Sequence, residues 1–344
     1  MAISPLRAWS LRLDPFVITL LCTLLLAGVL PPSGWWSDTV HTVSPFVIAM
    51  LFFLSGARLS RRAVRHGFTR WKLQITVLVI SFLAFPLLGL GFSHLVQPWT
   101  GTTLALGLLF LASLPSVVQS STMFTAIAGG NVPASVCAAA ISNLAGVVIT
   151  PGLMVLMAGS HLALDGTTAL KVVVQVLVPF AVGQLLHGVL KGWITAHEKI
   201  VRALDRGGIL VIVYGAIGAA VDSGSLLTQG LSALLLVGAI CVVLLALVLT
   251  ASWLIGNALQ MPREDRITLL FCAGEKSLTT GLPLSALIFP ASIAGVVILP
   301  VIIYHQMQLI ACSVIAGRLA QAEKRRPANQ CQKSVTDNSS AHHD

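Results

Sequence analysis

Apolar runs long enough to cross a lipid bilayer recur along almost the whole chain, and this repetition constrains the fold more than any other feature. The runs extend from Pro15 to Gly317 with short polar breaks between them. A bilayer core takes about 20 helical residues at a rise of about 1.5 Å each. Only 10% of the 344 residues are charged, against about 25% in soluble proteins. The sequence therefore predicts an all-α polytopic membrane protein.

The spacing of the apolar runs predicts about ten transmembrane helices. Their predicted ranges are 15–31, 43–57, 74–96, 102–128, 132–158, 168–190, 207–222, 229–257, 265–289 and 291–316. Ten spans divide into two sets of five, and because five is odd the second set must enter the membrane with the opposite orientation. The sequence therefore predicts two inverted five-helix repeats, at residues 15–158 and 159–317.

The positions of Lys and Arg predict the orientation. They gather before the first span, after the second, after the sixth, before the ninth and after the tenth, whereas the loop after the third span has none. The positive-inside rule then places both termini in the cytoplasm of a cell with the protein in its inner membrane. These loops account for the formal charge of +9, so we expect a lipid bilayer and no nucleic acid as partner.

The two ends of the chain are predicted to lie outside the membrane. Residues 1–14 form a short cytoplasmic N-terminus before an uncleaved first helix, because no small-residue cleavage site follows that helix. Residues 318–344 turn to Lys, Gln, Asn, Ser and His. That composition predicts a disordered cytoplasmic tail.

Spans four and nine contain the most polar stretches at membrane depth. Span four reads SLPSVVQSSTMFTAIAGGN, with Pro115 and a cluster of hydroxyl and amide side chains that includes Gln119, Ser120 and Thr125. Span nine reads FCAGEKSLTTGLPLSALIFP. Interrupted helices at corresponding positions of two repeats expose backbone groups to a ligand. We therefore predict broken crossing helices and a binding site at spans four and nine.

Glu275 and Lys276 place an acid and a base side by side within span nine. A charge near the centre of a membrane helix costs about 2.5–3.5 kcal/mol on insertion scales. In a functional interpretation, Glu275 is the negative ligand of a cation and nearby hydroxyls complete the oxygen shell. In a structural interpretation, the two charges neutralise each other and hold the bundle together. The hydroxyls of span four also have a structural alternative, since they can bind carbonyls of their own helix.

No enzyme signature accompanies these features. The chain contains no Walker loop, G-x-S-x-G or H-E-x-x-H motif, and aspartate is nearly absent from the predicted spans. We therefore predict a protein that is not an enzyme and has no cofactor.

Three stretches resemble the bile acid:sodium symporter family, specifically its SBF-like branch. They are SLPSVVQSSTMFTAIAGGNVPAS, ISNLAGVVITPGL and EKSLTTGLP. The K-S-L-x-x-G-x-P run at Lys276–Pro283 is the most specific to that branch. The resemblance implies a ten-helix fold with a panel domain and a core domain, in which spans four and nine cross within the core.

The resemblance also implies a set of cation ligands. In sodium-coupled members of the family, two Na⁺ ions bind near the crossing through a Ser-Asn pair, a downstream Ser and Thr, and a Glu followed by a Gln-Asn pair. In this chain those positions correspond to Ser121 and Thr122, to Ser135 and Ala139, and to Glu275 with Thr279 and Thr280. Ser81 stands in the place of a glutamine in span three. Lys276 could replace one Na⁺ as a tethered cation, balance an organic anion, or serve structure alone.

These observations favour a secondary transporter that moves a small organic anion with Na⁺ by alternating access. Glu275, Ser121, Thr122, Ser135, Thr279, Thr280 and Ser81 are the predicted cation ligands, and Lys276, Ser277, Thr125 and Gln119 are assigned to substrate or coupling. Two alternatives stay open. One is a proton-coupled transporter that uses Glu275, and the other is a non-transporting membrane regulator of ion or envelope homeostasis.

Overall fold

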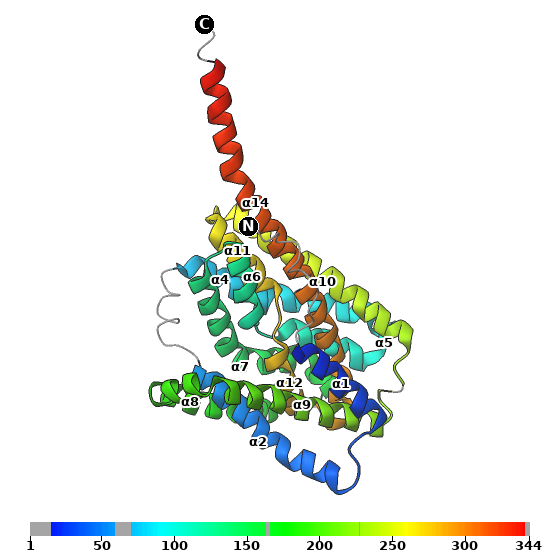
Figure 1. Ribbon diagram of the computed structural model, residues 1–344. Coiled ribbons are helices and arrows are strands. Elements are labelled where there is room, and N and C mark those ends of the chain that lie inside the picture. The colour runs from blue at the N-terminus through cyan, green and yellow to red at the C-terminus, as the bar shows by residue number, and fades with distance from the viewer. Residues whose placement is uncertain (1–14, 59–69, 163–165, 227, 341–344) are drawn as a thin grey trace.

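The computed structural model describes residues 15–58, 70–162, 166–226 and 228–340, and within these ranges its regular structure is helical throughout (Figure 1). The helices are α1 (Pro15–Val29), α2 (Trp35–Arg58), α4 (Trp71–Val79), the π-helix η3 (Ile80–Ala84), α5 (Phe85–Ser113), α6 (Gln119–Ile127), α7 (Val132–Leu162), α8 (Gly166–Ala196), α9 (Glu198–Asp222), α10 (Leu231–Ala258), α11 (Arg263–Gly274), α12 (Leu278–Ile288), α13 (Ala291–Val297) and α14 (Leu299–Ser340). The predicted all-α class is confirmed. The predicted N-terminus at residues 1–14 lies outside the described residues.

Seven helical segments in the described part of the chain are long and apolar enough to cross a membrane. They are Trp35–Arg58, Trp71–Ser113, Val132–Ala158, Val174–Ala196, Glu198–Asp222, Leu231–Ala258 and Ala291–Glu323. Large apolar side chains on their outer faces are exposed, for example Leu156, Leu185 and Val189 at 81, 72 and 80%. Such surfaces suit lipid and not water. The protein is therefore embedded in a membrane.

Three local features account for the difference between these seven segments and the ten predicted spans. Helix α1 has only 15 residues. The 43-residue segment Trp71–Ser113 covers two predicted spans in part, joined at Gly101, whose φ of 76° interrupts the helix. The predicted span at 265–289 is divided into α11 and α12. The count of ten spans and the inverted repeats thus stay predictions.

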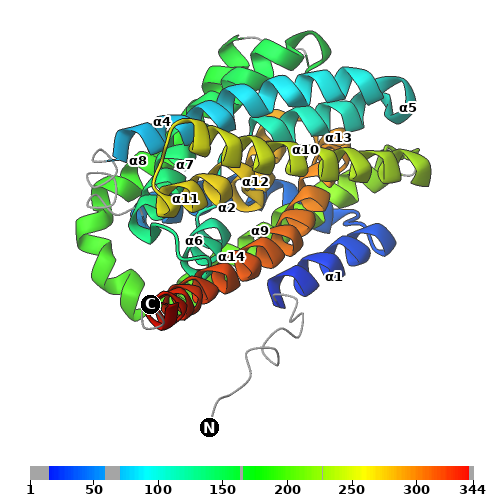
Figure 2. The ribbon, with the colours of Figure 1, turned by 90° about the horizontal axis from the view of Figure 1, so that it is seen from above.

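The helices form two groups, which we call the panel and the core after the fold that the resemblance implies. The panel contains α1, α2, α8 and α9, with α2 packed along α8 and α9 packed along α1 and α2. Figure 1 shows α2, α8 and α9 together below the other helices. The core contains α4 to α7 and α10 to α14, with α5 packed against α7, α10 and α14. Figure 2 shows α12 within the core, surrounded by the longer helices.

Glycines allow the closest approach between two panel helices. A side chain at Gly56 of α2 would meet the carbonyl of Phe180 in α8, and one at Gly183 of α8 would meet the carbonyl of Phe53 in α2. In lipid, where hydrophobic burial does not drive helices together, small residues at the interface let backbones pack closely. The α2–α8 contact therefore depends on these two positions.

A disordered tail is predicted at 318–344, whereas α14 continues as a helix to Ser340 and projects beyond the bundle (Figure 1). Residues 341–344 of that prediction lie outside the described residues. Residues 319–326 read LAQAEKRR, and all of these residue types have high helix propensity. The first turns are also held by Arg263, which binds the Glu323 carboxylate at 2.6 Å and the Leu319 carbonyl at 3.2 Å. The polar composition of this segment favoured disorder, whereas the helix propensity of its residues and the Arg263 contacts explain the observed helix.

Replacing Gly183 by alanine should separate α2 from α8. The new methyl group would lie 3.0 Å from the Ala57 nitrogen and against the Phe53 carbonyl. We therefore expect the free energy of unfolding to fall by about 1–3 kcal/mol, as in other overpacked sites. Thermal unfolding of the detergent-purified protein measures the loss. Gly188→Ala on the same helix is the matched control, because nothing lies within 4 Å of the added atom. Equal melting temperatures for the two variants would contradict the proposed tight contact.

Candidate functional site

Two helix interruptions meet inside the core. The first separates α5, which ends at Ser113, from α6, which begins at Gln119, and the second separates α11, which ends at Gly274, from α12, which begins at Leu278. The Ser277 backbone N–H donates to the Pro115 carbonyl at 2.9 Å. The interruptions predicted in spans four and nine thus lie in direct contact. We refer to them as the first break (114–118) and the second break (275–277).

Proline chemistry explains where the first break begins. Leu114 has an extended backbone, with φ −72° and ψ 152°, because the residue before a proline is sterically excluded from the helical region. Pro115 itself has no N–H to continue the helical hydrogen bonds. The chain therefore leaves the helix at a fixed point and exposes several carbonyl oxygens.

Every carbonyl from 112 to 116 accepts a hydrogen bond from another part of the core. Ala112 and Leu114 accept from the Lys276 ammonium, Ser113 from the Thr150 hydroxyl, Pro115 from the Ser277 N–H, and Ser116 from the Asn143 amide. The Ser116 N–H donates to the Ser142 hydroxyl. Unpaired backbone groups within the hydrocarbon layer cost several kcal/mol each. These contacts make the break tolerable at membrane depth.

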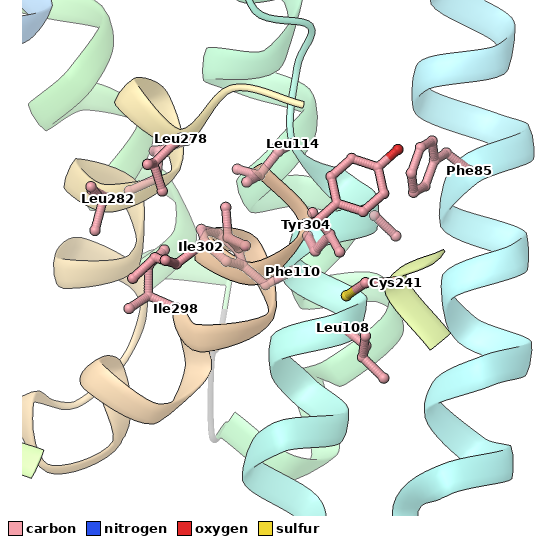
Figure 3. Close-up of a cluster of buried hydrophobic side chains, with 14 of the residues drawn as sticks. Phe85, Leu108, Phe110, Leu114, Cys241, Leu278, Leu282, Ile298, Ile302 and Tyr304 are labelled. Carbon is pink, nitrogen blue, oxygen red and sulfur yellow. The ribbon is translucent and has the colours of Figure 1, made fainter. Parts of the chain in front are cut away.

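Side chains of α14 form hydrogen bonds with the backbone groups at the second break in the same manner. The Gln308 side chain accepts from the Lys276 N–H at 2.8 Å and donates to the Lys276 carbonyl at 3.0 Å. The Tyr304 hydroxyl donates to the Gly274 carbonyl at 2.7 Å. Figure 3 shows the Tyr304 ring beside Phe85, within an apolar cluster that also contains Leu114. Helix α7 thus pairs part of the first break, and α14 pairs the second.

Glu275 lies at the C-terminal end of α11 with its carboxylate fully buried. The Ser120 hydroxyl of α6 donates to the Oε2 atom of Glu275, and Oε1 has no hydrogen-bond partner among the described residues. A buried carboxylate with an unpaired oxygen is costly unless a proton or a cation joins it. Glu275 therefore offers a site inside the core for a proton or a cation.

Lys276 is directed away from Glu275. Its Nζ atom donates to the carbonyls of Ser81, Ala112 and Leu114 at 3.0, 3.0 and 2.7 Å. The backbone at Glu275 is extended, with φ −95° and ψ 139°, and successive side chains of an extended chain point to opposite sides. The structure therefore separates the two charges and does not pair them as an ion pair.

A group of hydroxyls lies beside Cys272, one helical turn before Glu275. Ser135 of α7 is the centre of this group, with its Oγ atom 3.4 Å from the hydroxyls of Thr122 and Thr125 and 3.2 Å from the Cys272 sulfur. The structure thus brings together three of the predicted site residues from α6 and α7.

Of two adjacent serines in α6, the structure places Ser120 and not Ser121 against Glu275. The Ser121 hydroxyl, a predicted cation ligand, donates to the Val117 carbonyl in the first break. Ser120, which the sequence marked only as a member of the polar cluster, is the residue that contacts Glu275. One residue corresponds to about 100° of rotation around a helix, so only the packing of α6 against α11 selects between them.

Two further predicted residues, Thr279 and Thr280, lie beside Ser277. The Ser277 hydroxyl accepts from the Thr280 N–H at 3.2 Å and so caps α12. The Thr280 hydroxyl donates to the Asn143 side chain at 2.8 Å, and the Thr279 hydroxyl lies 3.1 Å from that of Ser277. Gln119 is exposed at the start of α6. Ser81 lies in η3, where its backbone carbonyl accepts from the Lys276 ammonium. Asn143 joins the first break to the first turn of α12.

The site is closed in this conformation. Glu275, Lys276 and Ser277 are 0, 1 and 2% exposed. A cavity of about 290 Å³ lies elsewhere, between α10, α11 and α14, where it is lined by apolar side chains such as Leu249 and Leu270. Access to the acid therefore requires movement of surrounding helices.

Comparison with known proteins shows extensive similarity. The family model described as the SBF-like CPA transporter family matches residues 14–321. Uncharacterized protein PA2026 of Pseudomonas aeruginosa is 41% identical over 90% of this chain and 93% of its own length. Putative symporter YfeH of Escherichia coli is 36% identical over 92% and 96%. Sodium/bile acid cotransporter 7 of Rattus norvegicus is 26% identical over 80% and 82%.

Removal of the Gln308 amide should destabilise the protein, because backbone groups at the second break lose their hydrogen-bond partners. Gln308→Leu leaves the Lys276 N–H and carbonyl unpaired, and each unsatisfied buried group costs about 1–3 kcal/mol. We expect a markedly lower melting temperature in detergent. Gln306→Leu is the matched control, since the Gln306 Nε2 atom has no partner among the described residues. If Gln306→Leu were the more damaging change, the assigned role of Gln308 would be wrong.

Proposed function

Because the chain belongs to the SBF-like CPA transporter family, we propose that it is a secondary active transporter that couples a small organic anion to Na⁺ by alternating access. Membership confirms the resemblance to the SBF-like branch of the bile acid:sodium symporters. The family consists of transporters, so the prediction that the chain is not an enzyme is also confirmed. Our proposal concerns the coupling ion, the substrate and the residues that bind them.

The observation that carries this proposal is the buried carboxylate of Glu275 at the meeting point of the two breaks. Its Oε1 atom is unpaired among the described residues, and the nearest base in sequence, Lys276, donates elsewhere. A charge held in this way within the membrane calls for a mobile positive partner. Binding and release of that partner would couple the ion gradient to movement of the core.

The ligand types favour Na⁺ as this partner. The Glu275 carboxylate, the Ser120 hydroxyl and the hydroxyls of Thr122, Thr125 and Ser135 are oxygen donors, which hard cations prefer. The printed names of two relatives, a symporter and a sodium/bile acid cotransporter, agree with ion coupling. No further cofactor is needed for this chemistry.

The half-helices support an anionic substrate. Helices α6 and α12 begin at the two breaks, and helix N-termini carry partial positive charge that favours anions. Gln119 and Thr279 are exposed at these ends and can donate hydrogen bonds to an organic acid. Lys276 contributes less to substrate binding, because its ammonium is already bound to carbonyls.

Alternating access requires that the core move against the panel, since the site is closed here. We assign ten spans to two inverted five-helix repeats, by counting α1, α11–α12 and the two parts of the 71–113 segment as spans. The equivalent roles of α7 and α14, each of which pairs backbone groups of the break that precedes it, support this symmetry. The repeat boundaries at 15–158 and 159–317 follow from the same assignment.

We place the protein in the inner membrane with both termini in the cytoplasm. The basic residues of the loops that the charge bias places there include Arg70 and Arg263, which bind Asp265 at 3.1 Å and Glu323 at 2.6 Å. Figure 1 shows α4 and α11 beginning beside the point where α14 leaves the bundle. This face of the core therefore carries basic residues, as the positive-inside rule expects of a cytoplasmic face.

The test compares the thermal stability of detergent-purified protein in NaCl and in KCl at the same concentration. A cation that binds only the folded state stabilises it by about 2.7 kcal/mol at 100 times its dissociation constant. We expect a Na⁺-specific rise in melting temperature that Glu275→Gln abolishes. Glu264→Gln, at an exposed acid of the same helix, should retain the rise.

Two other outcomes would reject sodium coupling. A stability that depends on pH but not on Na⁺, and loses that dependence in Glu275→Gln, would establish the proton-coupled alternative. Identical curves in both salts at every pH would instead support a membrane regulator that does not transport.

A further inference from the structure

The Lys276 side chain ends in a shell of backbone oxygens within the core. Its ammonium group lies 2.7–3.0 Å from the carbonyl oxygens of Ser81, Ala112 and Leu114 and 4.1 Å from the centre of the Phe85 ring. The side chain is 1% exposed. An ammonium group has three N–H donors, and each has one carbonyl here. The coordination of the charge is therefore complete without an acidic partner.

The carbonyls of this shell are available for physical reasons. Ala112 and Leu114 lie at the C-terminal end of α5, where carbonyls have no helical partner and the helix dipole is negative. Ser81 lies in the π-helix η3, an irregular hydrogen-bonding pattern that often marks a functional position. The Phe85 ring presents its electron-rich face to the charge. Carbonyl oxygens at a helix break are also the groups that bind alkali cations in membrane transporters.

We propose that this shell is a monovalent cation site that the Lys276 ammonium occupies permanently as a tethered cation. The amine supplies the positive charge that the carbonyl oxygens at the first break require, and it crosses from the second break to do so. Lys276 thus joins the two broken helices through a cationic group that is covalently attached to the chain. No ion needs to enter this shell during any step of the cycle.

A consequence for coupling rests on the proposed transport function. With one cation site filled by Lys276, Glu275 is left as the acidic group at the breaks that can take a mobile cation. The transporter would then bind one exchangeable monovalent cation per cycle. Removal of the lysine amine should open the carbonyl shell to a second cation.

Chemical rescue tests the tethered cation directly. Lys276→Ala removes three methylene groups and the ammonium, which together have the size of n-propylammonium. We expect the variant to melt several degrees lower than wild type and to recover in n-propylammonium chloride, but not in tetramethylammonium chloride, which has no N–H donor. Wild type and Lys191→Ala, at an exposed lysine, should show no difference between the two salts. Equal melting of Lys276→Ala in both salts would overturn the proposal.

Lys276→Met keeps the test decisive if the alanine variant does not fold. Methionine fills much of the space without a charge and leaves three carbonyls unpaired, so we expect a lower melting temperature that n-propylammonium does not restore. A methionine variant as stable as wild type would show that the shell needs no cation and would reject the proposal.

Equilibrium binding of radioactive Na⁺ then separates this inference from the transport proposal. We expect one Na⁺ per chain in wild type and two in Lys276→Ala. Rescue by n-propylammonium together with no Na⁺ in wild type would retain the tethered cation and reject sodium coupling. Two Na⁺ in wild type, with the lysine intact, would contradict the single exchangeable cation.

Discussion

The need to pair backbone groups where two helices are interrupted inside the membrane determines the arrangement of the core. The carbonyls from 112 to 116 all accept hydrogen bonds from side chains or backbone of α7 or the second break. The hydrocarbon layer offers no water for this purpose. Helices α7 and α14 therefore have to lie where their amides and hydroxyls reach the breaks. The polar residues of these helices are structural requirements of the site as much as Glu275 is.

This constraint also explains why adjacent opposite charges act independently. The extended backbone at the second break sends Glu275 toward α6 and Lys276 toward the end of α5. The lysine meets the negative end of a helix, and the glutamate keeps one oxygen atom unpaired among the described residues. The Lys276 side chain links the two breaks, and in the proposed function Glu275 binds the mobile ion. A continuous helix would have set both side chains about 100° apart on one surface and could not have divided these roles.

Part of the site could be predicted because charged residues and proline are rare within membrane helices, so their positions are informative. Pro115, Glu275 and Lys276 mark the breaks from the sequence alone. The contacts within the site could not be predicted in the same way. Ser120 and Ser121 are adjacent and chemically identical, so their roles depend on the rotation of α6, and the partners of Lys276 are carbonyl oxygens, which every residue has.

The sequence by itself determined that this chain is a helical membrane protein of the SBF-like family, because long apolar runs and short motifs are local properties. It also located the two interrupted stretches, since proline and buried charge act on their own segments. Tertiary structure decided that the breaks touch and that Lys276 binds carbonyls and not Glu275. These outcomes depend on which surfaces meet across large sequence separations, and backbone acceptors leave no mark in the order of side chains.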